Sequence, residues 1–211
     1  MRDMTRWMGW AAAFFALVAL LGIAWFDPLV ATATAGGAAG SLWSRGTAWL
    51  DLLVLKEVSN FLLGALLLVA AAVALAVRAT RRRLGWRLLY LALVQSLSTL
   101  IADLAKPPLG RLRPFEAARE GGADVWWVGA NSFPSGHTAF YAGLFLPLIL
   151  IFPRYAPLLA LPPLFVAISR VVENDHYPGD VAASIALAAG LSAGLAFLLR
   201  RGDRPPGTGP A

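Results

Sequence analysis

The two histidines of the chain, His137 and His176, each lie in a short polar motif next to an apolar stretch. A neutral imidazole can act as a nucleophile or carry a proton near neutral pH, so two imidazoles on either side of one phosphorus could divide the work of nucleophile and acid. Asp180 follows His176 by four residues, a spacing that puts both on one helix face, where the carboxylate can hold one ring N–H. The sequence therefore predicts that Asp180 fixes the tautomer of His176 and leaves the other ring nitrogen free to attack.

Three cations accompany the histidines. Lys106 and Arg113 are seven residues apart in a proline-stiffened segment, and Arg170 precedes His176 by six residues. Strong cations gathered at one place bind multiply charged anions, of which phosphate is the obvious candidate. Ser135 and Gly136 come directly before an apolar stretch, so the free N–H groups and dipole of a helix start would add positive potential, and glycine would let an anion approach closely. We expect these five residues to bind phosphate.

The composition predicts a membrane protein that positions these motifs. Hydrophobic residues make up 58% of the 211 residues and charged residues 14%, with a mean hydropathy of +0.66. An ordinary soluble domain has about 45–50% apolar and about 25% charged residues. The long apolar runs exclude a disordered chain, a coiled coil and a secreted disulfide scaffold. The absence of cysteine excludes disulfides, cysteine nucleophiles and zinc–thiolate sites.

Six apolar stretches approach the length of about 20 residues that a membrane-spanning helix needs. We therefore expect an all-α, polytopic membrane protein, with residues 1–200 as a single domain and residues 201–211, which are rich in proline and glycine, as a disordered cytoplasmic tail. Prolines weaken the fifth stretch, although membrane helices tolerate them. The expected spans are Met8–Phe26, Phe61–Val77, Trp86–Ala105, His137–Phe152, Pro157–Val172 and Val181–Leu199.

The first span has an alternative interpretation as a cleaved signal peptide, because the segment Ala31–Ala35 contains an A-x-A pattern. A signal peptide has an apolar core of about 7–15 residues. Since the span Met8–Phe26 is longer than this, a retained helix is favoured.

The positions of lysine and arginine predict the orientation. With both termini in the cytoplasm, most of the 18 basic residues lie on the inner side and all three motifs lie on the outer side. The pI near 10.5 then reflects a positive cytoplasmic rim, including Arg81–Arg83, and does not require a nucleic-acid partner. The segment Gly36–Asn60 is expected to be amphipathic and interfacial, and Trp126 and Trp127 are expected at the headgroup level.

Taken in order, the motifs resemble the three-part signature of the type 2 phosphatidic acid phosphatase (PAP2) family. They read Lys-x6-Arg-Pro, Pro-Ser-Gly-His and Ser-Arg-x5-His-x3-Asp, and every signature position is present between Lys106 and Asp180. The hydropathy pattern around them is similar to that of the six-helix membrane members of the family. The resemblance therefore implies a PAP2-like helical bundle and an integral membrane lipid phosphatase.

The resemblance also implies a role for each residue. His176 would attack phosphorus to give a phosphohistidine, Asp180 would orient it, and His137 would protonate the leaving oxygen and later activate water. The non-bridging oxygens would be held by the cations and the helix start, namely Lys106, Arg113, Ser135, Gly136 and Arg170. Family members of this type need no metal, and we expect no cofactor.

The resemblance leaves the substrate open. A site at the outer surface of a bacterial plasma membrane, facing the periplasm or exterior, favours a lipid phosphate from the same leaflet. Phosphatidate, phosphatidylglycerol phosphate, undecaprenyl diphosphate and the phosphates of lipid A all fit chemically. The sequence does not indicate the oligomeric state.

Two other functions use the same residues. One is a lipid phosphotransferase that passes the phosphoryl group to an acceptor other than water, and the other is a non-catalytic lipid-binding or transport protein. Intact histidines argue against the second. Single residues also have ordinary structural explanations: Lys106 could pair with Asp103, and we assign no function to the remaining outer charges, Arg111, Glu116, Arg119, Glu120, Asp124, Glu173 and Asp175.

Overall fold

A computed structural model describes residues 2–36, 41–77 and 82–202. Within these ranges every regular element is a helix, so the all-α class is confirmed. The predictions for Arg78 and Arg81 and for the tail from residue 203 lie outside the described residues; α9 continues through Gly202. The elements are α1 (Arg2–Leu21), the π-helix η1 (Gly22–Phe26), α2 (Asp27–Ala33), α3 (Leu42–Leu53), α4 (Leu62–Val77), α5 (Arg82–Leu109), α6 (Pro114–Arg119), α7 (Gly136–Ile151), the 3₁₀ turn η3 (Pro153–Tyr155), α8 (Ala156–Val172) and α9 (Pro178–Gly202).

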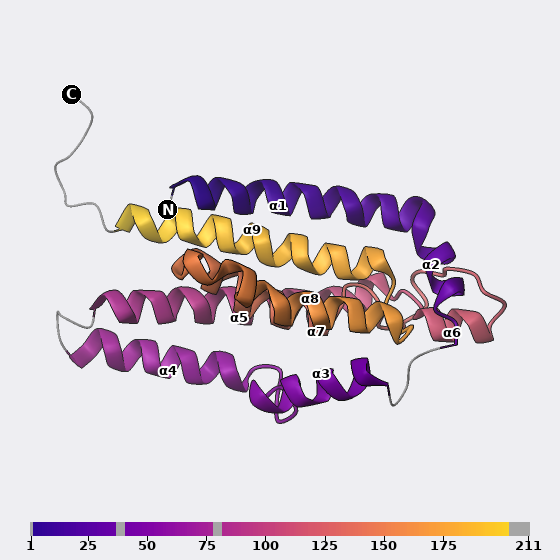
Figure 1. The fold of residues 1–211 in the computed structure, drawn as a ribbon, viewed down its shortest axis with the longest axis horizontal. Helices are drawn as coiled ribbons and strands as arrows, with labels where there is room; N and C mark the ends of the chain where they lie inside the picture. Colours follow the sequence, from indigo (N-terminus) through magenta and orange to yellow (C-terminus); the bar gives the residue numbers. More distant parts are fainter. Residues whose placement is uncertain (1, 37–40, 78–81, 203–211) are drawn as a thin grey trace.

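The long helices lie roughly parallel and alternate in direction (Figure 1). α1, α5 and α8 run toward the end of the bundle that carries α2 and α6, and α4, α7 and α9 run away from it. The start of α1 and the end of α9 therefore lie at the opposite end together. This alternation gathers the segments between α5 and α7 and between α8 and α9 at one end of the molecule.

Four helical segments are long and apolar enough to cross a membrane: Met4–Ala33, Arg83–Arg119, Pro153–Val172 and Pro178–Leu199. They correspond to the first, third, fifth and sixth predicted spans. α4 and α7 have 16 residues each, so each is about 24 Å long, whereas the hydrocarbon core is about 30 Å thick. The crossing of the membrane by these two helices remains a prediction.

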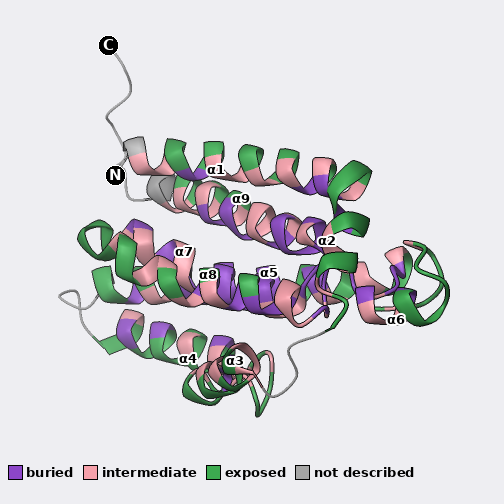
Figure 2. Ribbon diagram, turned by 45° about the vertical axis from the view of Figure 1, so that its right-hand side comes forward, coloured by how far each residue is buried: buried purple, intermediate pink, exposed green. Residues whose placement is uncertain are grey.

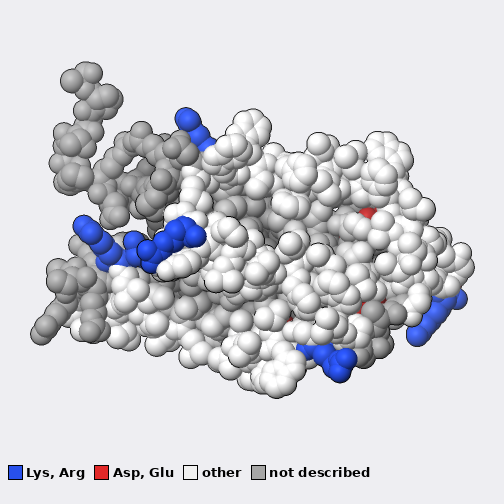
Figure 3. Space-filling view, in the orientation of Figure 1, with Lys and Arg blue, Asp and Glu red and all other residues white. Residues whose placement is uncertain are grey.

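The surface of the bundle has the apolar character of a protein embedded in lipid. Large side chains such as Trp7, Phe14 and Leu17 on α1 are more than half exposed. Figure 2 shows exposed residues along the outer edge of α1 and buried residues concentrated in the middle of the bundle. On the face drawn in Figure 3, lysine and arginine side chains gather toward the two ends and leave a broad uncharged stretch between them.

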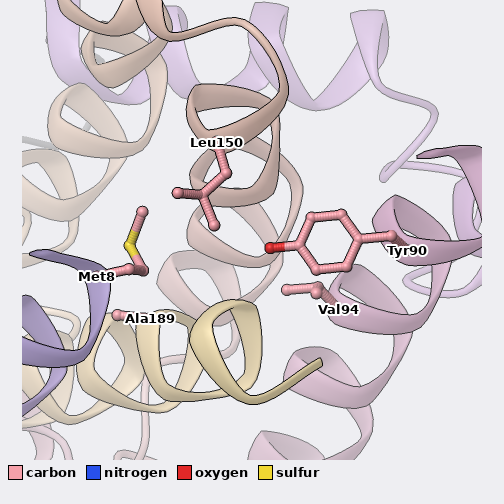
Figure 4. Close-up of a cluster of buried hydrophobic side chains, with 5 residues drawn as sticks. All are labelled: Met8, Tyr90, Val94, Leu150 and Ala189. Atoms are coloured by element: carbon pink, nitrogen blue, oxygen red, sulfur yellow. The ribbon is translucent and has the colours of Figure 1, made fainter. Parts of the chain in front are cut away.

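Small residues let the helices approach closely. α9 is rich in alanine, glycine and serine, and it packs along α1 and α7. One buried cluster joins Met8 of α1, Tyr90 and Val94 of α5, Leu150 of α7 and Ala189 of α9 (Figure 4). The Tyr90 hydroxyl donates a 2.8 Å hydrogen bond to the carbonyl oxygen of Ser192 in α9, so its polar atom is satisfied inside the bundle.

α3 confirms that the segment after α2 contains an amphipathic helix. Several of its apolar residues, including Leu42, Trp49 and Leu53, are exposed, whereas Thr47 and Asp51 are buried. The helix therefore directs its polar stripe toward the protein and its apolar side outward, the reverse of a helix on a soluble domain. Buried polar side chains need partners inside the protein, and those of α3 are described below.

Candidate active site

All three sequence motifs meet at the end of the bundle where α5 and α8 finish and α7 and α9 begin (Figure 1). Two hydrogen bonds join the second motif to the third. The backbone N–H of Ser135 donates to the carbonyl oxygen of Asp180 over 3.3 Å, and the Ser184 hydroxyl donates to the carbonyl oxygen of Ser135 over 2.9 Å. The start of α7 is thereby fixed against the first turn of α9.

Ser135 is the N-cap of α7, and its side-chain oxygen accepts hydrogen bonds from the backbone N–H and the hydroxyl of Thr138. A capping serine is what a helix start favours. At Gly136, the next residue, an added Cβ would lie 2.8 Å from Nζ of Lys106. The missing side chain therefore lets the lysine ammonium group reach the positive end of α7, as an anion-binding site at a helix start requires.

The three predicted cations are all paired with carboxylates. Lys106 forms an ion pair with Asp103, with Nζ and Oδ1 3.0 Å apart. The pairing that the sequence suggested for this lysine is therefore present in the protein without a ligand. Asp175 bridges the other two cations, since its carboxylate lies 3.6 Å from Nη1 of Arg113 and 3.0 Å from Nη1 of Arg170. A carboxylate that we had left without a function thus brings the two arginines together.

Arg170 has three hydrogen-bond partners and one nitrogen without a partner among the described residues. Its guanidinium group bonds Glu173, Asp175 and the hydroxyl of Ser169. Its Nε is buried and has no hydrogen-bond partner among the described residues. Since an unpaired buried donor is costly, this nitrogen is suited to an anionic ligand.

Glu173 lies between the end of α8 and His176, and its carboxylate is tied to Arg170. Burial raises the pKa of Glu173 above its ordinary value, although the charge of Arg170 opposes the shift. The carboxylate therefore takes up a proton at a higher pH than a free glutamate does. When it does so, Arg170 loses part of its charge compensation and becomes a better anion site.

His176 and Asp180 lie together and are almost inaccessible to solvent. Nδ1 of His176 is 3.4 Å from Oδ2 of Asp180, an ion-pair distance that is longer than a typical N–H···O bond. Oδ2 also accepts hydrogen bonds from the Ser132 hydroxyl over 2.6 Å and from the backbone N–H of Tyr177 over 3.0 Å. Nδ1 of His176 makes no hydrogen bond among the described residues, so Asp180 is its ion-pair partner only, and Nε2 is the ring nitrogen that does not face this carboxylate.

Arg111 belongs to this site although the sequence analysis gave it no function. It is completely buried, and its Nη1 donates to Oδ1 of Asp180 over 2.5 Å. Its other nitrogens bond Asp124, and its guanidinium group stacks on the ring of Tyr177, 3.9 Å from the ring centre. The arginine therefore fixes the carboxylate that lies beside His176.

Asp27 anchors this network from the start of α2. Its Oδ2 accepts from Nη2 of Arg111 over 2.6 Å, and its Oδ1 accepts from the backbone N–H of Gly179 over 2.8 Å. A Cβ on Gly179 would lie 2.6 Å from Oδ2 of Asp27, so the glycine is what permits this close approach.

His137, the second residue of α7, has a partner that the sequence analysis did not identify. Its Nε2 lies 3.1 Å from Oδ2 of Asp51 on α3. The side chain of His137 is 31% exposed, whereas that of Asp51 is 8% exposed. Each histidine of the chain thus has a buried carboxylate beside it.

Among the described residues, no group of three or more histidine, aspartate or glutamate side chains is arranged to hold a metal ion. The aspartates around Arg111 are occupied by its guanidinium group.

Comparison with known proteins identifies two relatives that match about half of the chain. The chain is 32% identical over 125 residues to a lipid A 1-phosphatase of Rhizobium johnstonii, covering 56% of this chain and 50% of that protein. It is 31% identical over 112 residues to a lipid A 1-phosphatase of Rhizobium etli, covering 51% of this chain and 48% of that protein. The chain thus spans about half the length of these curated relatives, and no solved structure matches it.

The family model of the PAP2 superfamily matches residues 83–203, which include all three motifs and more than half of the chain. The resemblance drawn from the motifs is confirmed: the chain belongs to the PAP2 superfamily.

Proposed function

We propose that the chain is an integral membrane phosphatase that hydrolyses a phosphate monoester or diphosphate of a membrane lipid through a phosphohistidine intermediate. The observation that carries this proposal is the pairing of His176 with the buried carboxylate of Asp180, next to two arginines that Asp175 holds together. A nucleophile with a fixed tautomer beside clustered cations is the arrangement that phosphoryl transfer needs.

In the first step, Nε2 of His176 attacks phosphorus while the bond from phosphorus to the leaving oxygen breaks. His137 donates a proton to that oxygen, so the lipid leaves as an alcohol from a monoester or as a lipid monophosphate from a diphosphate. Lys106, Arg113, Arg170 and the start of α7 bind the non-bridging oxygens, and the unpaired Nε of Arg170 is one available donor.

In the second step, water attacks the phosphohistidine and His137 accepts a proton from it. The bond between phosphorus and nitrogen breaks, its electron pair returns to the imidazole, and inorganic phosphate is released. No metal takes part in either step, so chelation of divalent cations is expected to leave the rate unchanged.

The substrate that we propose to test first is a phosphorylated glycolipid of the lipid A type. Two relatives about 31% identical to this chain carry the name lipid A 1-phosphatase. Phosphatidate, phosphatidylglycerol phosphate and undecaprenyl diphosphate remain chemically suitable and complete the panel.

The proposed setting is the plasma membrane of a bacterium, crossed six times, with both termini in the cytoplasm and the active site facing the periplasm or exterior. The start of α1 and the end of α9 lie at one end of the bundle and the motifs lie at the other, as an even number of crossings requires (Figure 1).

The test is phosphate release by the detergent-solubilised protein from the four lipids in the presence of EDTA. The proposal predicts release by the wild type and none above background by His176→Ala. Glu57→Gln, which alters an exposed residue in the turn after α3, is the control for handling and folding.

Release that requires added metal, or equal release by His176→Ala, would exclude this mechanism. Transfer of the phosphoryl group to an added alcohol in preference to water would instead support the phosphotransferase.

A further inference from the structure

α3 carries a stripe of three residues that dock it on the helices of the site. Trp43, Thr47 and Asp51 are spaced by four residues and share one helix face. The Trp43 ring stacks on Phe165 of α8, with ring centres 5.1 Å apart and an angle of 27° between the planes. Thr47 and Ser169 share a buried 2.8 Å hydrogen bond between their hydroxyl groups. The stripe therefore fixes the position and rotation of α3 on α8.

The third residue of the stripe, Asp51, reaches across to α7. Its Oδ2 lies 3.1 Å from Nε2 of His137, and its Oδ1 accepts a 2.7 Å hydrogen bond from the Tyr141 hydroxyl. His137 and Tyr141 are four residues apart and present both groups on one face of α7. Both carboxylate oxygens are thus engaged, and the side chain has one defined orientation.

Asp51 is held in its charged form. Burial alone would raise its pKa, but the hydrogen bonds with His137 and Tyr141 and the charge of Lys56 keep the pKa of Asp51 below its ordinary value. An ionised carboxylate accepts hydrogen bonds and donates none. Nε2 of His137 must therefore carry the proton of their shared hydrogen bond, which leaves Nδ1 as the nitrogen that exchanges a proton with a ligand.

We propose that Asp51 is a positioning residue for His137, which orients the imidazole through Nε2 and stabilises its protonated form, so that α3 completes the active site. The catalytic part of this inference rests on the proposed function, in which His137 protonates the leaving oxygen. α3 lies outside residues 83–203, the part of the chain that the family model covers.

A carboxylate next to an imidazole favours the imidazolium, so loss of its charge makes the ring release its proton at lower pH. The other charged or titratable groups around His137 are Tyr141 on α7, Lys56 in the turn after α3 and Arg170 on α8. Burial of the ring disfavours its protonated form most strongly, and the charges of Lys56 and Arg170 act in the same direction, opposite to that of Asp51. Asp51 is therefore the group whose removal shifts the titration of His137 downward.

The first experiment measures the rate of Asp51→Asn against leaving group and pH. A general acid contributes most when the leaving group is a poor one. We expect kcat to fall about 10- to 100-fold for an alkyl phosphate and less than about threefold for an aryl phosphate such as p-nitrophenyl phosphate, with little change in KM. The limb of the kcat profile in which activity falls as pH rises should move about one pH unit lower.

The control for these measurements is Glu57→Gln, which removes a carboxylate from the turn after α3 without touching His137 and should behave like the wild type in both profiles. Tyr141→Phe removes one hydrogen bond from Asp51 and keeps its charge, so it should lower kcat less than Asp51→Asn does.

The second experiment does not depend on activity. The chain has two histidines, so a His176→Ala background leaves His137 as the source of a single histidine signal in the ¹⁵N-labelled protein. Its titration midpoint should fall by about one pH unit when Asp51→Asn is added, and should not move with Glu57→Gln.

An unchanged midpoint, or equal losses of kcat for the alkyl and aryl phosphates, would overturn the inference. If the midpoint shifts but the wild type releases no phosphate from any lipid, the pairing of Asp51 with His137 stands and the proposed function fails.

Discussion

Arg111→Met removes a buried cation that binds three carboxylates at once. The guanidinium group makes four hydrogen bonds, to Asp27, to Asp180 and twice to Asp124. At about 1.5–3 kcal/mol for each bond to a charged group, their gross contribution is about 6–12 kcal/mol. The carboxylates that lose Arg111 can take up protons, which reduces the net loss of stability. We expect a net loss of about 3–5 kcal/mol, the usual cost of removing one partner of a buried ion pair.

This loss should lower the melting temperature in detergent by about 6–20 °C, at about 2–4 °C per kcal/mol for a chain of this size. The activity should change in a distinctive way. Because Arg111 holds Asp180 and is completely buried, we expect kcat to fall about 100-fold while KM for the lipid phosphate stays within about twofold.

The assay is thermal unfolding followed by tryptophan fluorescence, together with phosphate release at saturating substrate. The matched control is Arg119→Met, the same substitution at an exposed arginine of α6 that stacks on Phe115. A variant Arg111→Met that melts within about 2 °C of the wild type and retains its kcat would refute the role given to this arginine.

Three further outcomes are expected. Gly136→Ala places a methyl group 2.8 Å from Nζ of Lys106, which must then move away, so KM for lipid phosphate should rise about fivefold with kcat nearly unchanged, in steady-state assays; an unchanged KM would argue against Lys106 as a phosphate ligand. Asp27→Asn weakens the anchor of Arg111 on α2 and should lower both the melting temperature and kcat, whereas wild-type values would show that Asp27 contributes nothing to the site. Glu173→Gln removes a carboxylate from Arg170 and should lower KM about fivefold at neutral pH, at about 1 kcal/mol for such a charge. Because the pKa of Glu173 is raised, the wild type protonates this group as pH falls, so the ratio of the two KM values should approach one in acid; a constant ratio between pH 5 and 8 would contradict the assignment.

The sequence was sufficient to predict the all-α fold, and it identified the local motifs that the structure brings together at one end of the bundle. His176 and Asp180 are four residues apart at the start of a helix, and Ser135 and Gly136 precede one, so residue type and spacing carry the prediction. Apolar length predicted where the helices lie. It did not separate the longer helices from α4 and α7, which have 16 residues each, fewer than the about 20 of a typical membrane span.

The partners of the site residues could not be predicted because they come from distant parts of the chain. Arg111 lies 84 residues from Asp27, and His137 lies 86 residues from Asp51. Spacing conveys nothing about such pairs, which depend on how α2 and α3 fold back on the bundle. One signal was present: Asp27 and Asp51 are ionisable residues inside or next to apolar stretches, where such groups are costly without a partner.

The central claim is that a phosphoryl group passes through His176. The most direct test mixes radiolabelled lipid phosphate with the solubilised protein, stops the reaction within milliseconds in alkaline denaturant, which preserves phosphohistidine, and maps the label by peptide analysis. The account predicts label on the peptide that contains His176 in the wild type and none in His176→Ala. Active wild-type protein that carries no label, or label on any other residue, would contradict it.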